Sequence, residues 1–331
     1  MNDLQKLKNA ATYDGIDNRI VEFKEKIEMP SGLRVTGRFF YLTFRDKKIT
    51  EAEFAQFIYD KIIRYCIPRK KINEAFERFN ETHDERFITA LHDQAKNLFV
   101  KSLKSHGAQL GEPGELIAFI ILEYFFNAPQ IACKMFLKTS EKMPVHGSDS
   151  VHVRMTDDGE SLELFWGEAK MYSELSNAME EALNSIISFL YGKEDDIETR
   201  PPRDRDIDII KDHPNVENEN MRVALLKYFD PYEKESNHLK EIFMCMLGFD
   251  YYLYNHIEDR TDDAEVYFKT QYVKKIKEAI TLFEKKIKSK HLKDFEFSLV
   301  LLPFQSLDNF RKEFFKHLGI TGREIEECSD G

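Results

Sequence analysis

The sequence predicts an α/β or α+β fold, in which helices pack against a mixed sheet. Strand-like runs rich in aromatic and β-branched residues alternate along the chain with helical stretches, and this alternation is typical of such layered folds. A turn-rich segment at residues 156–161 separates two strand-like runs and predicts a hairpin. At 331 residues the chain is long enough for one large domain or two modest ones.

The pattern of the first hundred residues predicts a mixed, mostly helical section, and we place its limits at residues 1 and 104. The run "LRVTGRFFYLTF" (33–44) has the composition of a strand. Thr50 followed by Glu53 resembles a capping box, and it opens a helical pattern over residues 51–67. Two further helical stretches are expected at residues 72–83 and 85–103.

Residues 105–320 predict the main core, and a tail follows at 321–331. Leu116 to Phe126 is apolar on nearly all sides, which favours a buried helix. Residues 193–220 are charged and contain prolines, so we expect an exposed loop or insertion there. The remaining elements expected are a helix at 173–192, a strand at 241–254, a helix at 268–289, a buried strand at 295–304 and a last helix that ends at Gly319.

The composition is that of a soluble globular protein, with 42% apolar and 32% charged residues. No run of about 18 uninterrupted apolar residues occurs, so no transmembrane helix is expected. The first residues, "MNDLQKLKNAATYDG", lack the apolar core of a secretion signal. We therefore expect a cytoplasmic protein with no membrane partner.

The cysteines and histidines favour neither a zinc site nor a disulfide framework. A zinc site needs close ligand pairs, and a disulfide framework needs an oxidising compartment. The ten histidines include no His-x-x-x-His pair, and the four cysteines are widely separated. We expect reduced thiols, most of them buried, at Cys66, Cys133, Cys245 and Cys328.

The formal net charge of −11 argues against a freely DNA-binding protein, because long-range steering depends on the charge of the whole molecule. A local basic stripe can still bind phosphates. Two candidate stripes are "PRKK" (68–71) and "KKIKSKHLK" (285–293), and each also fits an ordinary solvated helix face. An acidic exterior also fits a subunit that docks onto a basic partner.

The predicted hairpin brings one acid from each strand to the same end of the ladder. If Met155 pairs with Leu162 across the turn "TDDGES", the numbers of paired residues sum to 317 along the antiparallel ladder. Asp149 is then opposite Glu168. Directly opposed residues have Cβ atoms roughly 4.5–5.5 Å apart. Two carboxylates that close repel unless a positive charge lies between them.

A divalent cation relieves that repulsion. Magnesium prefers oxygen ligands, typically one or two carboxylates with water and phosphate, so we expect Asp149 and Glu168 to bind it. Lys170 is two residues after Glu168 and points to the same face of the strand, where its ammonium can orient a water or stabilise charge on a phosphate. The alternative is an exposed Glu–Lys pair with an unrelated aspartate nearby, because bare Asp-x(n)-Glu-x-Lys matches often arise by chance.

A third acid precedes the predicted buried helix. Glu115 near the helix N-terminus is favourable through the helix dipole alone, or it serves as a further metal ligand. Glu112 competes for the same role, because Pro113 leaves the start of the helix undefined. Glu123, inside the apolar helix, is a weaker third candidate.

Taken in order, Glu115, Asp149 and "GEAK" (167–170) resemble the PD-(D/E)XK nuclease superfamily, in which an acid on a first helix precedes a hairpin bearing Asp and Glu-x-Lys. The stretches "HGSDSVHVRM", "LELFWGEAKMY" and "FSLVLLPFQSLDNFRKEFFKHL" are similar to HamA, the nuclease effector family of Hachiman anti-phage systems. The resemblance covers roughly residues 105–320. Ser148 stands where the superfamily name has proline.

The resemblance implies a restriction-endonuclease-like fold and a Mg²⁺-dependent DNA nuclease in which Mn²⁺ can substitute. It implies that Asp149, Glu168 and Glu115 bind the metal and that Lys170 assists the attacking water. It also implies control by a partner helicase, HamB.

Two other functions stay open. One is a repair or restriction-type PD-(D/E)XK endonuclease, which would share the site but not the neighbouring helicase. The other is a non-catalytic binding module with this fold, which would be expected to lack one of the acids or the lysine. A nucleotide-hydrolysing enzyme is disfavoured, because no G-x-x-x-x-G-K-[ST] loop occurs.

Overall fold

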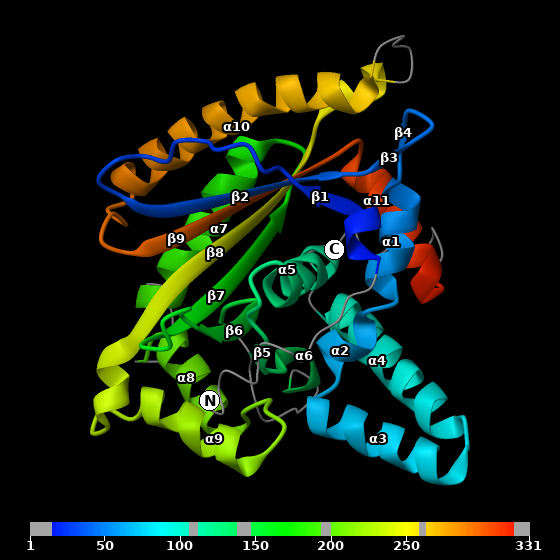
Figure 1. Cartoon of the computed structure of the whole chain (residues 1–331), viewed down its shortest axis with the longest axis vertical. Coiled ribbons are helices and arrows are strands. Elements are labelled where there is room, and N and C mark those ends of the chain that lie inside the picture. Colours follow the sequence, from blue (N-terminus) through cyan, green and yellow to red (C-terminus); the bar gives the residue numbers. More distant parts are fainter. Residues whose placement is uncertain (1–14, 106–111, 138–146, 193–199, 258–262, 321–331) are drawn as a thin grey trace.

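The central feature of the protein is a seven-stranded mixed sheet with the strand order β1-β2-β9-β8-β7-β6-β5 (Figure 1). The computed structural model describes residues 15–105, 112–137, 147–192, 200–257 and 263–320. The strands are β1 Ile20–Glu22, β2 Arg34–Leu42, β5 Gln130–Ala132, β6 Ser150–Met155, β7 Leu162–Met171, β8 Leu239–Asp250 and β9 Glu296–Phe304, with β3 Phe44–Arg45 and β4 Lys48–Ile49 forming a separate small hairpin. The predicted mixed sheet flanked by helices is confirmed.

The four central strands, β2, β9, β8 and β7, run parallel, and antiparallel strands lie at both edges. Strands buried on both faces need continuous apolar sequence. The runs "IFMCMLGF" in β8 and "FSLVLLPF" in β9 meet that need, and every one of their residues is buried. These two strands therefore lie at the centre of the domain.

Helices cover both faces of this sheet and create two hydrophobic cores (Figure 1). One core packs helices α7 and α10 against the sheet, and the other packs α1, α5 and α11 against the opposite face. In β7 the alternation is direct, since Leu164 and Trp166 enter the first core while Phe165 enters the second. The helices are α1 Glu51–Tyr59, α2 Ile62–Cys66, α3 Arg69–Thr82, α4 Arg86–Ser105, α5 Glu112–Tyr124, α6 Lys134–Leu137, α7 Leu175–Tyr191, α8 Pro202–Asp212, α9 Glu219–Leu226, α10 Ala264–Ser289 and α11 Leu307–Leu318.

The exposed loop predicted near residues 193–220 is wrong over residues 202–212, whereas residues 213–218 have no regular secondary structure, as expected. Residues 202–212 form α8, which buries Asp206, Ile209 and Ile210 against the sheet core. The apolar residues of "DIDIIKD" recur at helical spacing, but the charged surroundings hide that pattern. Residues 193–199 of the predicted loop lie outside the described residues.

Two further boundaries differ from the sequence prediction. The strand expected at 241–254 ends at Asp250, and Tyr252–His256 forms a 3₁₀ turn instead. The section predicted at residues 1–104 contributes β1 and β2 to the same sheet as β9, so the sheet crosses the predicted boundary. The tail predicted at 321–331 lies outside the described residues.

Helix α1 begins after Thr50 as predicted, but it lacks the expected capping box. The Thr50 side chain makes no capping hydrogen bond; its hydroxyl instead donates to the Thr43 carbonyl at 3.1 Å. Glu53 pairs with Arg45 in the small β3–β4 hairpin. The local pattern marks the helix start correctly, although the hydroxyl binds the preceding hairpin.

Cys66, Cys133 and Cys245 are buried thiols, as expected; Cys328 lies outside the described residues. Of the helices described, none has the length and apolar character needed to cross a membrane.

Candidate active site

The hairpin of β6 and β7 has the register predicted from its turn. Met155 pairs with Leu162, and the same register continues to Ser150 and Gly167. Residue numbers of the paired positions therefore sum to 317 along the whole ladder, and this prediction is confirmed. Asp149 lies one residue beyond the last regular pair, at the end of the ladder.

The ladder ends irregularly at Asp149. Its backbone N–H donates to the Gly167 carbonyl at 3.0 Å, and its carboxylate Oδ2 accepts the backbone N–H of Ala169 at 2.8 Å. The Asp149 side chain thus lies across the backbone of β7, immediately beside Glu168. This is the neighbourhood that the register predicts, reached through a side-chain bond to the backbone and not through a further ladder pair.

Gly167 makes this close approach feasible. A Cβ atom at Gly167 would lie only 2.3 Å from the Ser150 hydroxyl oxygen across the ladder. Any larger residue would therefore displace Ser150, which immediately follows Asp149. The close pairing of β6 and β7 therefore explains why the first residue of "GEAK" is glycine.

Glu168 is buried in the face of the sheet that α7 covers. Its side chain is 7% exposed and contacts the Lys170 ammonium, with 2.7 Å between Oε1 and Nζ. The Ser185 side chain on α7 also forms a hydrogen bond with the Glu168 carboxylate. Because residues i and i+2 of a strand share a face, Lys170 reaches Glu168 from the same strand, as predicted.

The two carboxyl groups destabilise each other's charge. Burial raises the pKa of Asp149 well above its ordinary value, and the nearby Glu168 and Glu115 carboxylates raise it further. Burial also raises the pKa of Glu168, although Lys170 and Ser185 partly offset this. Such mutual repulsion between buried carboxylates is relieved by a bound cation.

Lys170 stays charged in this environment. Burial works against its ammonium, but the Glu168 and Asp149 carboxylates outweigh burial and raise the pKa of Lys170. A single ammonium therefore faces two acidic side chains, and its ion pair is with Glu168. Glu115 adds a third acidic group nearby.

Glu115, in the first turn of α5, lies close enough to this site to affect its acids. Its charge raises the pKa values of both Asp149 and Glu168. The buried Tyr65 hydroxyl of α2 donates to Glu115 Oε2 at 2.6 Å, and burial, followed by the Glu115 charge, raises the pKa of that tyrosine well above its ordinary value.

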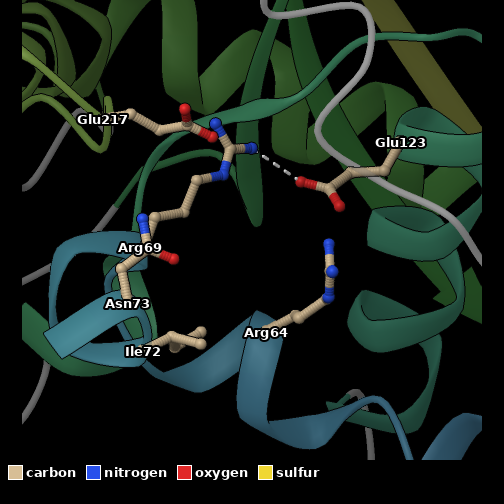
Figure 2. Close-up of a pocket in the computed structure, with 6 residues that line it drawn as sticks. All are labelled: Arg64, Arg69, Ile72, Asn73, Glu123 and Glu217. Carbon is tan, nitrogen blue, oxygen red and sulfur yellow. Dashed lines mark hydrogen bonds and ion pairs between the residues drawn. The ribbon is translucent and has the colours of Figure 1, made fainter. Parts of the chain in front are cut away.

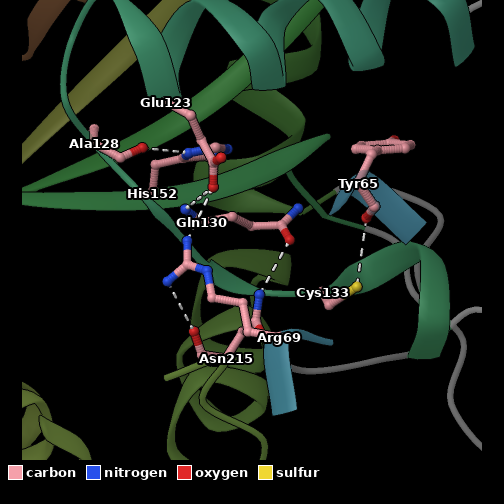
Figure 3. Close-up of polar contacts among 8 residues, drawn as sticks. All are labelled: Tyr65, Arg69, Glu123, Ala128, Gln130, Cys133, His152 and Asn215. Atoms are coloured by element: carbon pink, nitrogen blue, oxygen red, sulfur yellow. Dashed lines mark hydrogen bonds and ion pairs between the residues drawn. The ribbon is translucent and has the colours of Figure 1, made fainter. Parts of the chain in front are cut away.

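The two competing acids on α5 differ. Glu112 is the first residue of α5, and its side chain lies outside the part of the chain that the structure describes. Glu123 forms a buried ion pair with Arg69 at 2.9 Å and accepts the Gln130 backbone N–H at 3.2 Å. Figure 3 shows this network, which also includes Asn215, with His152 beside it. Glu123 therefore has a structural partner set away from Asp149 and Glu168.

His152 lies beside this network and has a contact of its own. It is fully buried on β6 with Nδ1 2.7 Å from the Ala128 carbonyl, and burial lowers its pKa to about 4. A neutral histidine at that position fills the core and carries no charge at neutral pH.

A small cavity opens beside this network and not beside the hairpin acids. Its volume is about 70 Å³, and its lining residues are Arg64, Arg69, Ile72, Asn73, Glu123 and Glu217 (Figure 2). In Figure 2 the Arg69 guanidinium faces the Glu123 carboxylate across it. None of Asp149, Glu168 and Lys170 lines this cavity, so it is separate from the candidate active site.

Asp149 and Glu168 supply the oxygen ligands that a hard divalent cation prefers, and their mutual repulsion fits such an ion. Within the described ranges, no three His, Cys, Asp or Glu side chains already lie in a metal-binding arrangement. Metal binding by Asp149, Glu168 and Glu115 stays a prediction.

Sequence reasoning missed Tyr65 and Ser185. Tyr65 is one aromatic residue among several in an apolar helical pattern, and Ser185 is one polar residue in α7. Nothing in their local spacing distinguishes them, because each reaches the site only through tertiary packing. The sequence contains no short-range signal for either residue.

A family model described as HamA matches residues 17–318 of the chain. The match extends over the sheet, the hairpin acids and α5, and it confirms the resemblance identified from the sequence. No curated protein matches the chain.

Proposed function

The chain belongs to the HamA family of Hachiman anti-phage defence proteins, and from this premise we propose that it is a metal-dependent nuclease that hydrolyses DNA phosphodiester bonds. The observation that carries the proposal is the half-buried Asp149 beside the buried Glu168, with the Lys170 ammonium 2.7 Å from Glu168. Strongly perturbed carboxyl groups gathered around one charged lysine are typical of functional sites.

In this proposal Asp149 and Glu168 hold Mg²⁺, or Mn²⁺ as a substitute, and Glu115 completes the set of acids. When bound, the ion polarises the phosphate and lowers the pKa of a water molecule. Asp149 is held in place by the Ala169 N–H, and Glu115 by the Tyr65 hydroxyl. These bonds reduce the reorganisation that the acids need when they bind a cation.

Lys170 is the group proposed to act on the reacting atoms. The neighbouring carboxylates keep its ammonium charged, so it is available to orient a water or to stabilise negative charge that develops on a phosphate oxygen. Lys170 shares its face of β7 with Glu168, so its ammonium would lie beside any group held by that carboxylate.

We further propose that a helicase subunit of the same defence system controls the nuclease. The net charge of −11 supports this, because an acidic molecule gains little from long-range attraction to DNA. A partner that already holds DNA would supply the substrate. A Hachiman setting with a partner protein is what the family implies.

The test is plasmid degradation by the purified chain, with and without its helicase partner, in Mg²⁺ and in EDTA. We expect cutting that needs the metal and that disappears in Glu168→Gln. A matched control is Glu284→Gln, which breaks the exposed i, i+4 pair with Lys288 on α10 and should leave cutting unchanged. Metal-independent cutting, or equal loss in both variants, would refute the proposal.

The same experiment separates the two alternatives. A repair or restriction-type endonuclease would cut at full rate without the helicase. A non-catalytic module would cut under no condition, although the presence of Asp149, Glu168 and Lys170 in one group weighs against it.

A further inference from the structure

We propose that a buried ion pair between Lys134 and Asp206 positions Asp149 by holding the residue before it, Ser148. The inference rests on the proposed function, in which Asp149 is a ligand of the catalytic cation. It assigns Lys134 and Asp206 as positioning residues that touch neither metal nor DNA.

The pair lies where three distant segments of the chain meet. Lys134 is on α6 and is 3% exposed; Asp206 is on α8 and is 1% exposed; Ser148, between them, is 6% exposed. The Lys134 ammonium contacts the Asp206 carboxylate directly. Its second bond is to the Ser148 backbone carbonyl, 2.5 Å from Nζ.

Asp206 binds the other side of Ser148. Its Oδ2 accepts the Ser148 backbone N–H at 3.1 Å and the Ser148 hydroxyl at 3.0 Å. The ion pair thus uses the N–H, the C=O and the hydroxyl of a single residue. With both backbone groups bonded to a buried pair, the peptide that leads into Asp149 has one fixed orientation.

Asp149 is then held from both directions. On its N-terminal side is the clamped Ser148, and its own N–H donates to the Gly167 carbonyl at 3.0 Å. The carboxylate can reach the Ala169 N–H only if the backbone keeps this course. The ladder of β6 begins at Ser150, so Asp149 lacks the strand pairing that would otherwise fix it.

Gly147 provides an independent sign that the close contact is built into the chain. A Cβ atom on Gly147 would lie 2.5 Å from Asp206 Oδ1, closer than non-bonded atoms approach. The carboxylate can occupy its position only because residue 147 has no side chain. The three residues of "GSD" at 147–149 therefore act together. Gly147 leaves space for the Asp206 carboxylate, Ser148 is hydrogen-bonded to that carboxylate, and Asp149 is thereby oriented toward Ala169.

Helix α8 is itself fixed to the strand that carries Glu168. Arg203 donates to Glu241 Oε2 at 2.8 Å, and the same carboxylate oxygen accepts the Trp166 indole N–H at 2.7 Å. Beyond the helix, the Asn215 N–H donates to the Ile131 carbonyl of β5 at 2.7 Å. Asp206 therefore projects from an element with a defined position relative to β7, which a positioning role requires.

General stability is a poor explanation for this ion pair. Replacing a buried ion pair with apolar residues of similar size is often neutral or stabilising, because the desolvation cost of two charges offsets their attraction. An apolar pair would fill the space but could not bind the N–H, C=O and hydroxyl of Ser148. The arrangement is thus better suited to fixing a backbone than to stabilising a core.

The test uses the double variant Lys134→Met with Asp206→Leu. It removes both charges together, so that neither is left buried alone. We expect a folded protein in which the DNA-cutting rate falls about 10²-fold, the loss typical of an approximately 1 Å displacement of a catalytic group. Exchange of the Ala169 amide hydrogen should become at least about tenfold faster, because the Asp149 carboxylate no longer protects it.

Two controls accompany the double variant. Arg38→Met with Glu22→Leu removes another ion pair, part-buried between β1 and β2; it should change stability but neither the Ala169 exchange nor the cutting rate. Ser148→Ala keeps both backbone bonds and loses only the two bonds of the hydroxyl, to Asp206 and from Lys134, so its cutting rate should fall less than about tenfold.

The amide exchange separates this inference from the proposed function. If the wild-type chain cuts no DNA but the Ala169 amide hydrogen still exchanges faster in the double variant, the proposed nuclease function is refuted. The positioning of Asp149 by Lys134 and Asp206 is then still supported. A folded double variant with wild-type cutting and wild-type exchange overturns the positioning role, as does an equal effect in the Arg38 and Glu22 control. Should the double variant fail to fold, Gly147→Ala gives a second route, because its Cβ displaces Asp206; unchanged Ala169 exchange in that variant would overturn the inference.

Discussion

The Asp149 carboxylate accepts a hydrogen bond from the backbone N–H of Ala169, with 2.8 Å between Oδ2 and nitrogen. Ala169 separates Glu168 from Lys170 in the sequence, so this bond ties the lone aspartate directly to the Glu-x-Lys strand. It also satisfies one oxygen of a carboxylate whose pKa is raised by burial and by Glu168. The bond fixes the side chain without supplying a positive charge.

Asp149→Asn should therefore keep the fold and lose the function. The amide oxygen can still accept from Ala169, but the charge that attracts a cation is gone. Loss of an outer-shell partner typically reduces metal affinity or activity by 10–100-fold, so loss of a ligand should reduce cutting by at least about 10²-fold. Calorimetric Mn²⁺ titration and plasmid cutting measure the two effects. Asp158→Asn, in the exposed turn of the same hairpin, is the control, and wild-type cutting by Asp149→Asn would contradict the assignment.

Tyr65→Phe tests the hydrogen bond that holds Glu115. The variant removes one hydroxyl from a buried pair with a 2.6 Å bond, and a typical loss of this kind costs about 1 kcal/mol of stability. We expect the Mg²⁺ concentration for half-maximal cutting to rise, because Glu115 is less well oriented. Tyr59→Phe removes a tyrosine hydroxyl that pairs with His92 at 3.2 Å and should leave the Mg²⁺ dependence unchanged. If both variants show the same Mg²⁺ dependence, Glu115 is not a metal-binding residue of the site.

The hairpin was the most predictable part of the site because its information is local. A turn of Asp, Gly and Ser between two apolar runs sets the pairing, and the pairing of Met155 with Leu162 then fixes every later pair. The neighbourhood of Asp149 and Glu168 follows from that register. Lys170 follows from strand periodicity alone.

The supports of the site were not predictable from local patterns. Lys134 and Asp206 are 72 residues apart in the sequence, and their burial depends on α8 packing against the sheet. The sequence of α8 is rich in charge, and a charged segment usually indicates exposure. Only tertiary structure shows that Asp206 is 1% exposed and that its partner is a lysine.

Glu51 should make stability depend on pH. It begins α1 and is 9% exposed, and burial raises its pKa from 4.5 to about 7 despite hydrogen bonds from the Gln305 and Ser306 backbone. Because the folded protein binds the proton more tightly than the unfolded chain, this contribution to stability is complete below about pH 4.5 and is lost as pH rises through about 7.

Glu51→Gln removes that titration. The variant should match the wild type near pH 4.5 and exceed its stability above pH 7, by up to about 3 kcal/mol if the full shift is expressed. Urea denaturation of both proteins between pH 4.5 and 8 measures the difference. Glu53→Gln, on the same helix, is the control, and a Glu51 effect that does not vary with pH would contradict the argument.

The isolated chain should bind DNA weakly at physiological salt. Its net charge is −11, and part of the basic stripe in α10 is already paired, since Lys286 and Lys290 both contact Glu180 on α7. Fluorescence anisotropy with a labelled duplex across a salt series measures the affinity. Tight binding with a steep salt dependence would contradict the prediction, because each neutralised phosphate contributes a slope of about −0.9.

Lys170→Ala should separate metal binding from the chemical step. The wild-type ammonium lies 2.7 Å from Glu168 and is kept charged by its carboxylate neighbours. Removing it leaves Asp149 and Glu168 with more uncompensated negative charge, so Mn²⁺ affinity should stay the same or rise. Cutting should fall by roughly 10²–10³-fold, the loss typical when one stabiliser of developing charge is removed. Glu168→Ala should instead weaken both metal binding and cutting.

Metal titration, cutting rates and thermal melts on both variants test this difference. Lys288→Ala on α10, which loses an exposed pair with Glu284, is the matched control for removal of one lysine and should behave as the wild type. An exposed Glu–Lys pair contributes only about 0–1 kcal/mol and no catalysis, so a purely structural Lys170 would give the control's result. A folded Lys170→Ala protein that cuts DNA at the wild-type rate would show that the ammonium has no part in the reaction.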